Sequence, residues 1–103
     1  MVTERSVESA FRDFVKKQGG ETIKLGVNGK PDRLVVMPEG KTGFAEIKQP
    51  KGKLTPKQRH EIVRLFELGH VVGVIWSRAD FEPFLDRVRR GNASSIYRLK
   101  RPQ

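Results

Sequence analysis

The chain has 103 residues, 36% of them hydrophobic and 32% charged, which is enough for one domain with a single core over residues 1–103. Twenty-one Lys and Arg residues against twelve Asp and Glu residues give a formal net charge of +9, which favours a polyanionic partner, with nucleic acid foremost. The absence of cysteine excludes a disulfide framework and a thiolate zinc site, and we expect a cytoplasmic protein because no apolar segment is long enough to span a membrane.

The first half of the chain predicts a helix followed by an antiparallel meander. Apolar residues recur with helical spacing over residues 3–18, and Thr3 is placed to cap the start of this helix. Strands are expected at residues 22–25, 33–37 and around 44–48. Because the turn before the third strand is short, Asp32 at the start of the second should lie beside Glu46 and Lys48 near the end of the third.

The next segment predicts a crossover through a helix to a further strand. Thr55, Pro56 and Gln58 form a capping-box pattern with proline at the first helical position. The residues expected on the buried face of this helix are Ile62, Val63, Leu65, Phe66 and Leu68. A nearly continuous apolar run at residues 71–76 predicts a strand covered on both faces, parallel to the strand that carries Glu46.

The C-terminal part predicts a third helix, capped by Ser77 or Asp80 and running to about Arg90, and residues 94–99 are a candidate edge strand. The expected fold class is therefore α/β, with a mixed sheet of about four strands flanked by helices in the order αβββαβ and then a C-terminal helix. Apolar residues of the Trp76 strand, the third helix and the tail exceed what one small core requires, so these elements are candidates for a dimer interface.

Asp32, Glu46 and Lys48 carry the chemistry that this arrangement predicts. Two carboxylates on neighbouring strands suit a hard divalent cation, and a lysine can neutralise phosphate charge or orient an attacking water. In an otherwise basic chain the two acids weaken phosphate binding unless a cation bridges them. The pattern therefore favours a metal-assisted phosphodiester site.

Glu8 and Gln58 are ambiguous by spacing alone. Glu8 can form an ion pair with Arg12 one helical turn later, and Gln58 can return its amide to the Thr55 backbone as part of the cap. Either side chain can instead point at the Asp32 site.

The motif Pro31-Asp32, thirteen intervening residues and then Glu46-Ile47-Lys48 resembles the PD-(D/E)xK nuclease signature. The surrounding motifs are GG at 19–20, GKPDR at 29–33, FAEIK at 44–48, GKL at 52–54 and TPKQ at 55–58. Together they are similar to the VRR-NUC family of the restriction-endonuclease-like superfamily, from about Glu8 to Trp76. The compact length is similar to that of stand-alone members from bacteria and their phages.

This resemblance implies a set of site residues. The implied catalytic residues are Glu8, Asp32, Glu46, Lys48 and Gln58, with Glu4 as an alternative to Glu8. The implied ligands of Mg²⁺ or Mn²⁺ are Asp32, Glu46, the Ile47 carbonyl oxygen and Glu8. Basic residues expected to contact DNA are Lys24, Lys30, Arg33, Lys51, Lys53 and Lys57.

The resemblance also implies a divalent-metal-dependent DNA endonuclease. Stand-alone members are similar in acting as homodimers that cut four-way junctions, so we expect a Holliday junction resolvase in a bacterial or phage-infected cell. Two alternatives stay open: a flap-type nuclease and a non-catalytic basic nucleic-acid-binding module. A purely structural or partner-binding basic protein explains the charge but not the arrangement of two acids and a lysine.

Overall fold

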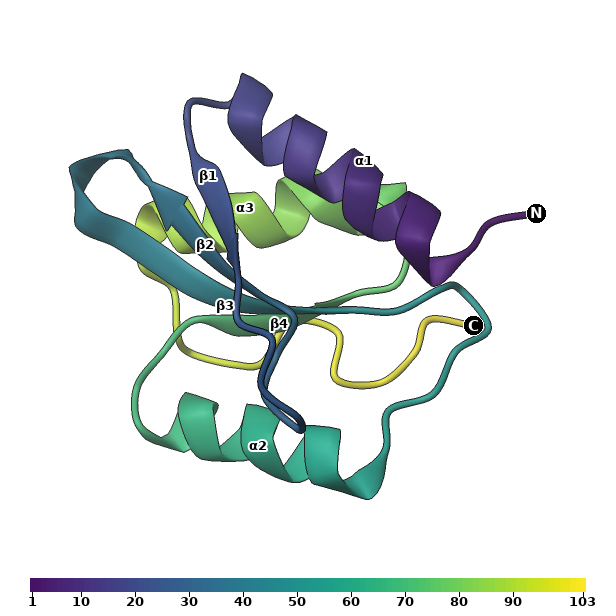
Figure 1. Ribbon diagram of the computed structural model, residues 1–103. Helices are drawn as coiled ribbons and strands as arrows, with labels where there is room; N and C mark the ends of the chain where they lie inside the picture. Colours follow the sequence, from purple (N-terminus) through teal and green to yellow (C-terminus); the bar gives the residue numbers. More distant parts are fainter.

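The computed structural model describes residues 1–103 and shows a four-stranded sheet between two layers of helices (Figure 1). The strands are β1 (Glu21–Lys24), β2 (Arg33–Met37), β3 (Lys41–Ile47) and β4 (Val72–Ile75). In the order β1-β2-β3-β4, the first three form an antiparallel meander and β4 pairs in parallel with β3. The predicted α/β class and mixed sheet are confirmed.

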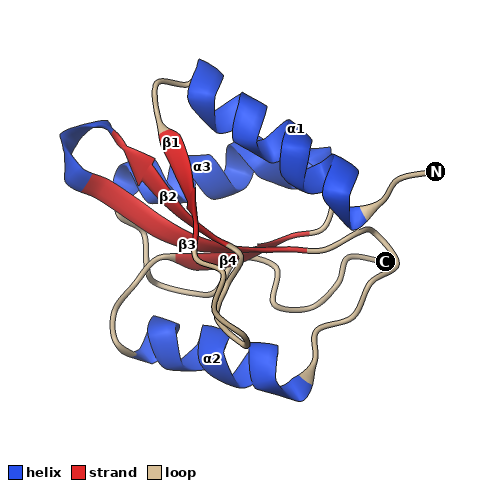
Figure 2. Cartoon of the chain, viewed as in Figure 1, coloured by secondary structure: helices blue, strands red, loops and turns tan.

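Three α-helices cover the sheet, as Figure 2 shows, with α1 and α3 on one face and α2 on the other. Their bounds are α1 (Glu4–Lys17), α2 (Pro56–Glu67) and α3 (Phe81–Arg90). Two short 3-10 helices, η1 (Pro38–Gly40) and η2 (Arg78–Asp80), precede β3 and α3. None of these helices combines the length and apolar character needed to cross a bilayer.

The helices begin where the sequence supplies caps. Thr3 Oγ1 accepts a hydrogen bond of 3.0 Å from the Ser6 backbone N–H, and Thr55 forms a reciprocal capping box with Gln58. At the start of α3 the expected cap is replaced by the η2 turn. Asp80 there accepts the Trp76 backbone N–H at 2.8 Å and so ties the end of β4 to α3.

The core lies in two layers on either side of the sheet. The larger layer joins α1 and α3 to the sheet and includes Phe11, Ile47 and Phe84, which are buried. The smaller layer joins α2 to β4 through Ile62, Leu65, Val72, Val74 and Trp76. The apolar residues of β4 and α3 are therefore used within one chain, which removes the reason for placing a dimer interface on them.

Leu68 departs from the predicted buried face of α2, since it is 61% exposed. It is the C-cap residue, with a backbone already outside regular helical geometry, and the chain turns at Gly69 with a φ of 95°. The helical spacing of apolar residues therefore extends one residue past the end of α2 at Glu67.

The C-terminal tail forms one parallel bridge to β4 instead of the expected edge strand. Tyr97 donates its backbone N–H to Val72 O at 3.0 Å and accepts from the Val74 N–H at 2.9 Å. Arg98 then adopts a left-handed backbone with a φ of 54°, which turns the chain away from the sheet. The pairing therefore ends after one residue, and the following segment runs beside the loop before α2.

Candidate active site

The register of β2 and β3 brings Asp32 and Glu46 together. Arg33 pairs with Ala45, so the preceding residue Asp32 lies across from the following residue Glu46. Asp32 Oδ2 accepts a hydrogen bond of 2.7 Å from the backbone N–H of Ile47, which holds its carboxylate against the end of β3. In an extended strand the N–H and C=O of one residue face the same neighbour, so we expect the Ile47 carbonyl oxygen to face Asp32 as well.

The electrostatic environment of Glu46 is unfavourable for a negative charge. Burial, followed by the negative charge of Asp32, raises the pKa of Glu46 to about 8, although the Lys48 ammonium opposes this rise. The Glu46 residue is only 2% exposed, and neither Glu46 nor Asp32 is in an ion pair. A cation placed between the two carboxylates would relieve both the desolvation and the repulsion.

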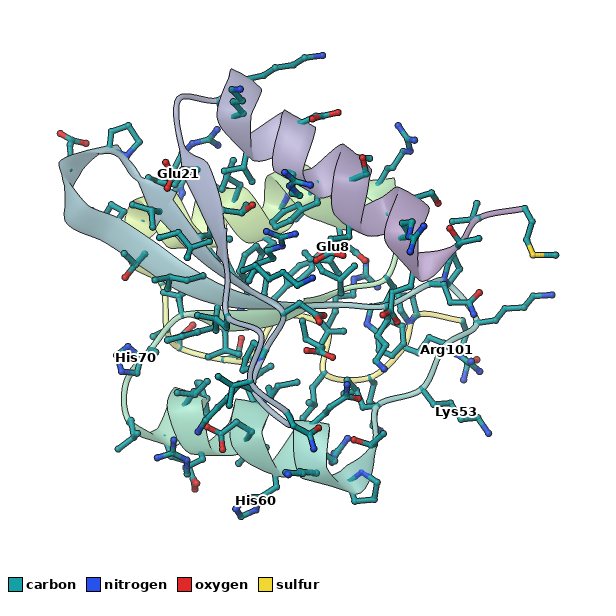
Figure 3. The ribbon with its side chains drawn as sticks, viewed as in Figure 1. Glu8, Glu21, Lys53, His60, His70 and Arg101 are labelled. Atoms are coloured by element: carbon teal, nitrogen blue, oxygen red, sulfur yellow. The ribbon has the colours of Figure 1, made fainter.

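Glu4 is the α1 carboxylate whose charge affects the pKa of Glu46. Burial raises the pKa of Glu4, Lys48 lowers it and Asp32 raises it further, and the charge of Glu4 acts in turn on Glu46. Glu8 lies between α1 and the sheet (Figure 3), where it accepts a 2.9 Å hydrogen bond from Nε of the buried Arg33. Glu8 thus pairs with Arg33 instead of Arg12, and the choice between Glu8 and Glu4 as a site residue stays a prediction.

Gln58 serves the helix cap and also lies at the edge of the site. Its Oε1 accepts the Thr55 backbone N–H at 2.9 Å, as the capping-box pattern predicted. With Asp32 and the loop between β1 and β2, it lines an open hollow of about 400 Å³. Its amide NH2 group is not used by the cap, and a role at the metal stays a prediction.

The loop that delivers Asp32 is fastened to α2, toward which it descends from the sheet in Figure 1. Lys30 forms an ion pair with Glu61, which also accepts a 2.8 Å hydrogen bond from Arg64 Nη2. Hydrogen bonds from Arg64 and Lys30 lower the pKa of Glu61 to about 2. Gly29 has a φ of 85°, and a Cβ atom there would fall 2.6 Å from Cε of Lys57.

Glu61 is not among the residues predicted from the sequence. Its only signal was a carboxylate beside Ile62 at the edge of the apolar face of α2, and its partner Lys30 is 31 residues away in the chain.

The basic residues expected to contact DNA fall into two groups. Lys24, Lys51, Lys53 and Lys57 are exposed. Arg33 is 8% exposed and paired with Glu8, and Lys30 is paired with Glu61. The Arg33 side chain is only 9% exposed and is occupied by its ion pair, whereas the paired Lys30 side chain is still 39% exposed, and contact of either residue with DNA stays a prediction.

The oxygen ligands available here suit an open Mg²⁺ site better than a metal site in which the protein supplies every ligand. No group of three or more His, Asp or Glu side chains is placed to hold a metal ion. Mg²⁺ typically takes one or two carboxylates and completes its shell with water and substrate phosphate. Asp32 and Glu46, with the Ile47 carbonyl, match that donor set, and Mn²⁺ accepts the same oxygen ligands.

Known proteins resemble this chain in both sequence and structure. The sequence is 44% identical over 81 residues to "Putative nuclease p44" of Acyrthosiphon pisum secondary endosymbiont phage 1, covering 76% of this chain and 87% of that protein. A solved VRR_NUC domain superposes with a TM-score of 0.73 and 29% identity, covering 82% of this chain and 97% of that one. No protein-family model matches the sequence.

Proposed function

The chain belongs to the VRR-NUC family of nucleases, and we propose that it is a divalent-metal-dependent DNA endonuclease acting at Asp32 and Glu46. The observation that carries the proposal is the pair of acids at the ends of β2 and β3, one of them buried with a pKa near 8, in a protein of net charge +9. Such a pair opposes phosphate binding unless a cation lies between it and the DNA.

The roles of the residues follow from their positions. Asp32, Glu46 and the Ile47 carbonyl oxygen would hold Mg²⁺ or Mn²⁺, whose chemistry at such a site is to polarise the scissile phosphate and activate a water molecule. Lys48 directly follows β3 and is half-buried, and its ammonium can orient the attacking water or offset the charge that builds on the phosphoryl oxygens. Asp32 is held in place by the Ile47 N–H and by the loop that Glu61 fastens to α2.

Four-way DNA junctions are the substrate that we propose, with two copies of the chain acting together. A twofold dimer presents two equivalent sites, which suits a junction that is cut on two strands. A flap-type nuclease would use the same residues on a different branched substrate. A non-catalytic binding module would have no use for a pair of acids, one of them buried, beside its phosphate-binding surface.

The test is a cleavage assay with a labelled four-way junction, a 5′ flap and plain duplex, each with Mg²⁺, Mn²⁺ or EDTA. The proteins are the wild type, Glu46→Gln, and the exposed α2 variant Glu67→Gln as a matched control. We expect paired, metal-dependent incisions in the junction by the wild type and the control, and none by Glu46→Gln. Cleavage of the flap alone would keep the chemistry and change the substrate, whereas cleavage by Glu46→Gln at the wild-type rate would refute the site.

A further inference from the structure

A second hollow, of about 600 Å³, lies between the loop before α2 and the C-terminal tail. Its floor includes Trp76 and Leu99, and no acidic residue lines it. The basic residues in its lining are Lys53, Arg59, Lys100 and Arg101. The first two come from the middle of the sequence and the last two from its end, so this concentration of charge exists only in the folded chain.

Specific contacts bring the two segments together. The Trp76 indole N–H donates to the Arg98 carbonyl at 2.9 Å, and Arg101 Nη1 donates to the carbonyls of Lys51 and Gly52 at 2.9 and 3.2 Å. Figure 3 labels Arg101 and Lys53 on the same side of the molecule, consistent with their shared place in the lining. The tail is therefore docked on the loop by defined hydrogen bonds.

No Asp or Glu side chain pairs with the basic residues of this hollow. Residues 48–59 contain five Lys or Arg residues and no Asp or Glu. None of the four basic side chains that line the hollow is in an ion pair, whereas Arg89, Arg90 and Arg98 elsewhere each pair with an acid. Exposed, mutually repelling cations around a concave surface are a typical footprint for a polyanion.

The hollow lies at the same end of the sheet as the acid pair. β3 and β4 are parallel, with Ile47 paired to Ile75, so Glu46 and Trp76 are both close to the C-terminal ends of their strands. The Lys48 N–H also donates to the Ile75 carbonyl at 2.9 Å. A nucleic-acid backbone at the acid pair can thus continue toward the hollow along this end of the sheet.

We propose that this hollow binds the phosphodiester backbone of the DNA beside the phosphate being cut, and that Arg59 and Lys100 contact it directly. The tail then contributes to the DNA-binding surface, on the β4 side of the acids. This inference rests on the proposed function for its choice of DNA as the ligand.

The test measures DNA binding without cleavage. A fluorescent four-way junction is titrated in EDTA at several salt concentrations with the wild type, with Arg59→Ala/Lys100→Ala, and with Lys16→Ala/Lys17→Ala. The last variant removes the same charge from exposed positions at the end of α1, on the opposite face of the sheet. Far-ultraviolet circular dichroism verifies that each variant is folded, because Trp76 lines the hollow itself and its fluorescence can respond to the substitutions directly.

Removing the side chain that meets one phosphate should reduce the slope of log K against log salt concentration by about 0.9. We therefore expect the Arg59/Lys100 variant to show a slope smaller by about 2 and to bind roughly tenfold or more weakly at 0.1 M salt, while the Lys16/Lys17 control keeps the wild-type slope. Equal slopes for the two variants would overturn the proposal. A wild type that binds but cuts nothing with any metal would refute the proposed function. The comparison of slopes would still decide whether the hollow binds the DNA backbone.

Discussion

Replacing Glu46 with glutamine should stabilise the metal-free protein, and increasingly so as the pH rises. The ordinary pKa of 4.5 describes Glu46 in the unfolded chain, whereas its pKa in the folded chain is about 8. Between these values the folded state holds a proton that the unfolded state has lost, so the free energy of unfolding falls as pH rises. The contribution of the protonated Glu46 carboxyl to the free energy of unfolding is fully present below about pH 4.5 and is lost as the pH rises through 8.

The magnitude follows from proton linkage. Between these two pKa values, the one extra proton bound by the folded state lowers the free energy of unfolding by about 1.4 kcal/mol for each unit of pH increase. The free energy of unfolding of the wild type should therefore fall by up to about 3 kcal/mol between pH 5.5 and pH 7.5, relative to that of Glu46→Gln. Glutamine has nearly the same shape as glutamic acid and does not ionise. The comparison therefore isolates the charge.

The assay is urea unfolding in EDTA, followed by the fluorescence of Trp76, which is 3% exposed in the fold. Both proteins are measured at pH 5.5, 6.5 and 7.5, and the difference in their free energies of unfolding is plotted against pH. Mg²⁺ should then stabilise the wild type at pH 7.5 and leave Glu46→Gln nearly unchanged. A difference that stays constant with pH would refute the description of Glu46 as a buried, proton-binding carboxyl.

Three further predictions concern the loop clamp, the sheet packing and the metal site. Glu61→Gln should lower the melting temperature at neutral pH, because the charge-assisted bond to Lys30 is lost. The difference in melting temperature from the wild type should disappear as the pH falls from 4.5 through 2. A difference that persisted in acid would contradict the ion pair as its cause. Gly73→Ala should cost about 2 kcal/mol in urea unfolding, because its Cβ would fall 2.5 Å from the Phe84 ring, and an unchanged midpoint would show that the packing yields. Binding of Mg²⁺ at pH 7 should release close to one proton, since Glu46 must ionise to hold the cation; calorimetry in buffers of different ionisation enthalpy measures this release, and a heat independent of the buffer would exclude it.

Local signals in the sequence predicted most of the fold. The predicted strand at 33–37 matches the bounds of β2, and Thr3 and Thr55 cap their helices as their side chains allow. The juxtaposition of Asp32 and Glu46 was also predictable, because a short turn between antiparallel strands leaves little freedom in register.

Contacts between distant segments were beyond such signals. Glu4 and Glu8 lie one helical turn apart on α1, and which of them acts on the acid pair depends on how that helix packs on the sheet. The Lys30–Glu61 pair depends on the path of a loop with two glycines of positive φ, since such residues leave many paths open. The left-handed backbone at Arg98, which ends the tail's pairing with β4, has no signature in an arginine.

Binding of a divalent cation by Asp32 and Glu46 can be measured directly in a Mn²⁺ titration followed by the electron paramagnetic resonance signal of the free ion. The proteins are the wild type, Asp32→Asn, Glu46→Gln and the exposed control Glu67→Gln. We expect the wild type and Glu67→Gln to remove the free-ion signal equally at pH 7.5 and both site variants to lose most of this binding. Equal Mn²⁺ binding by all four proteins would show that Asp32 and Glu46 do not hold the cation.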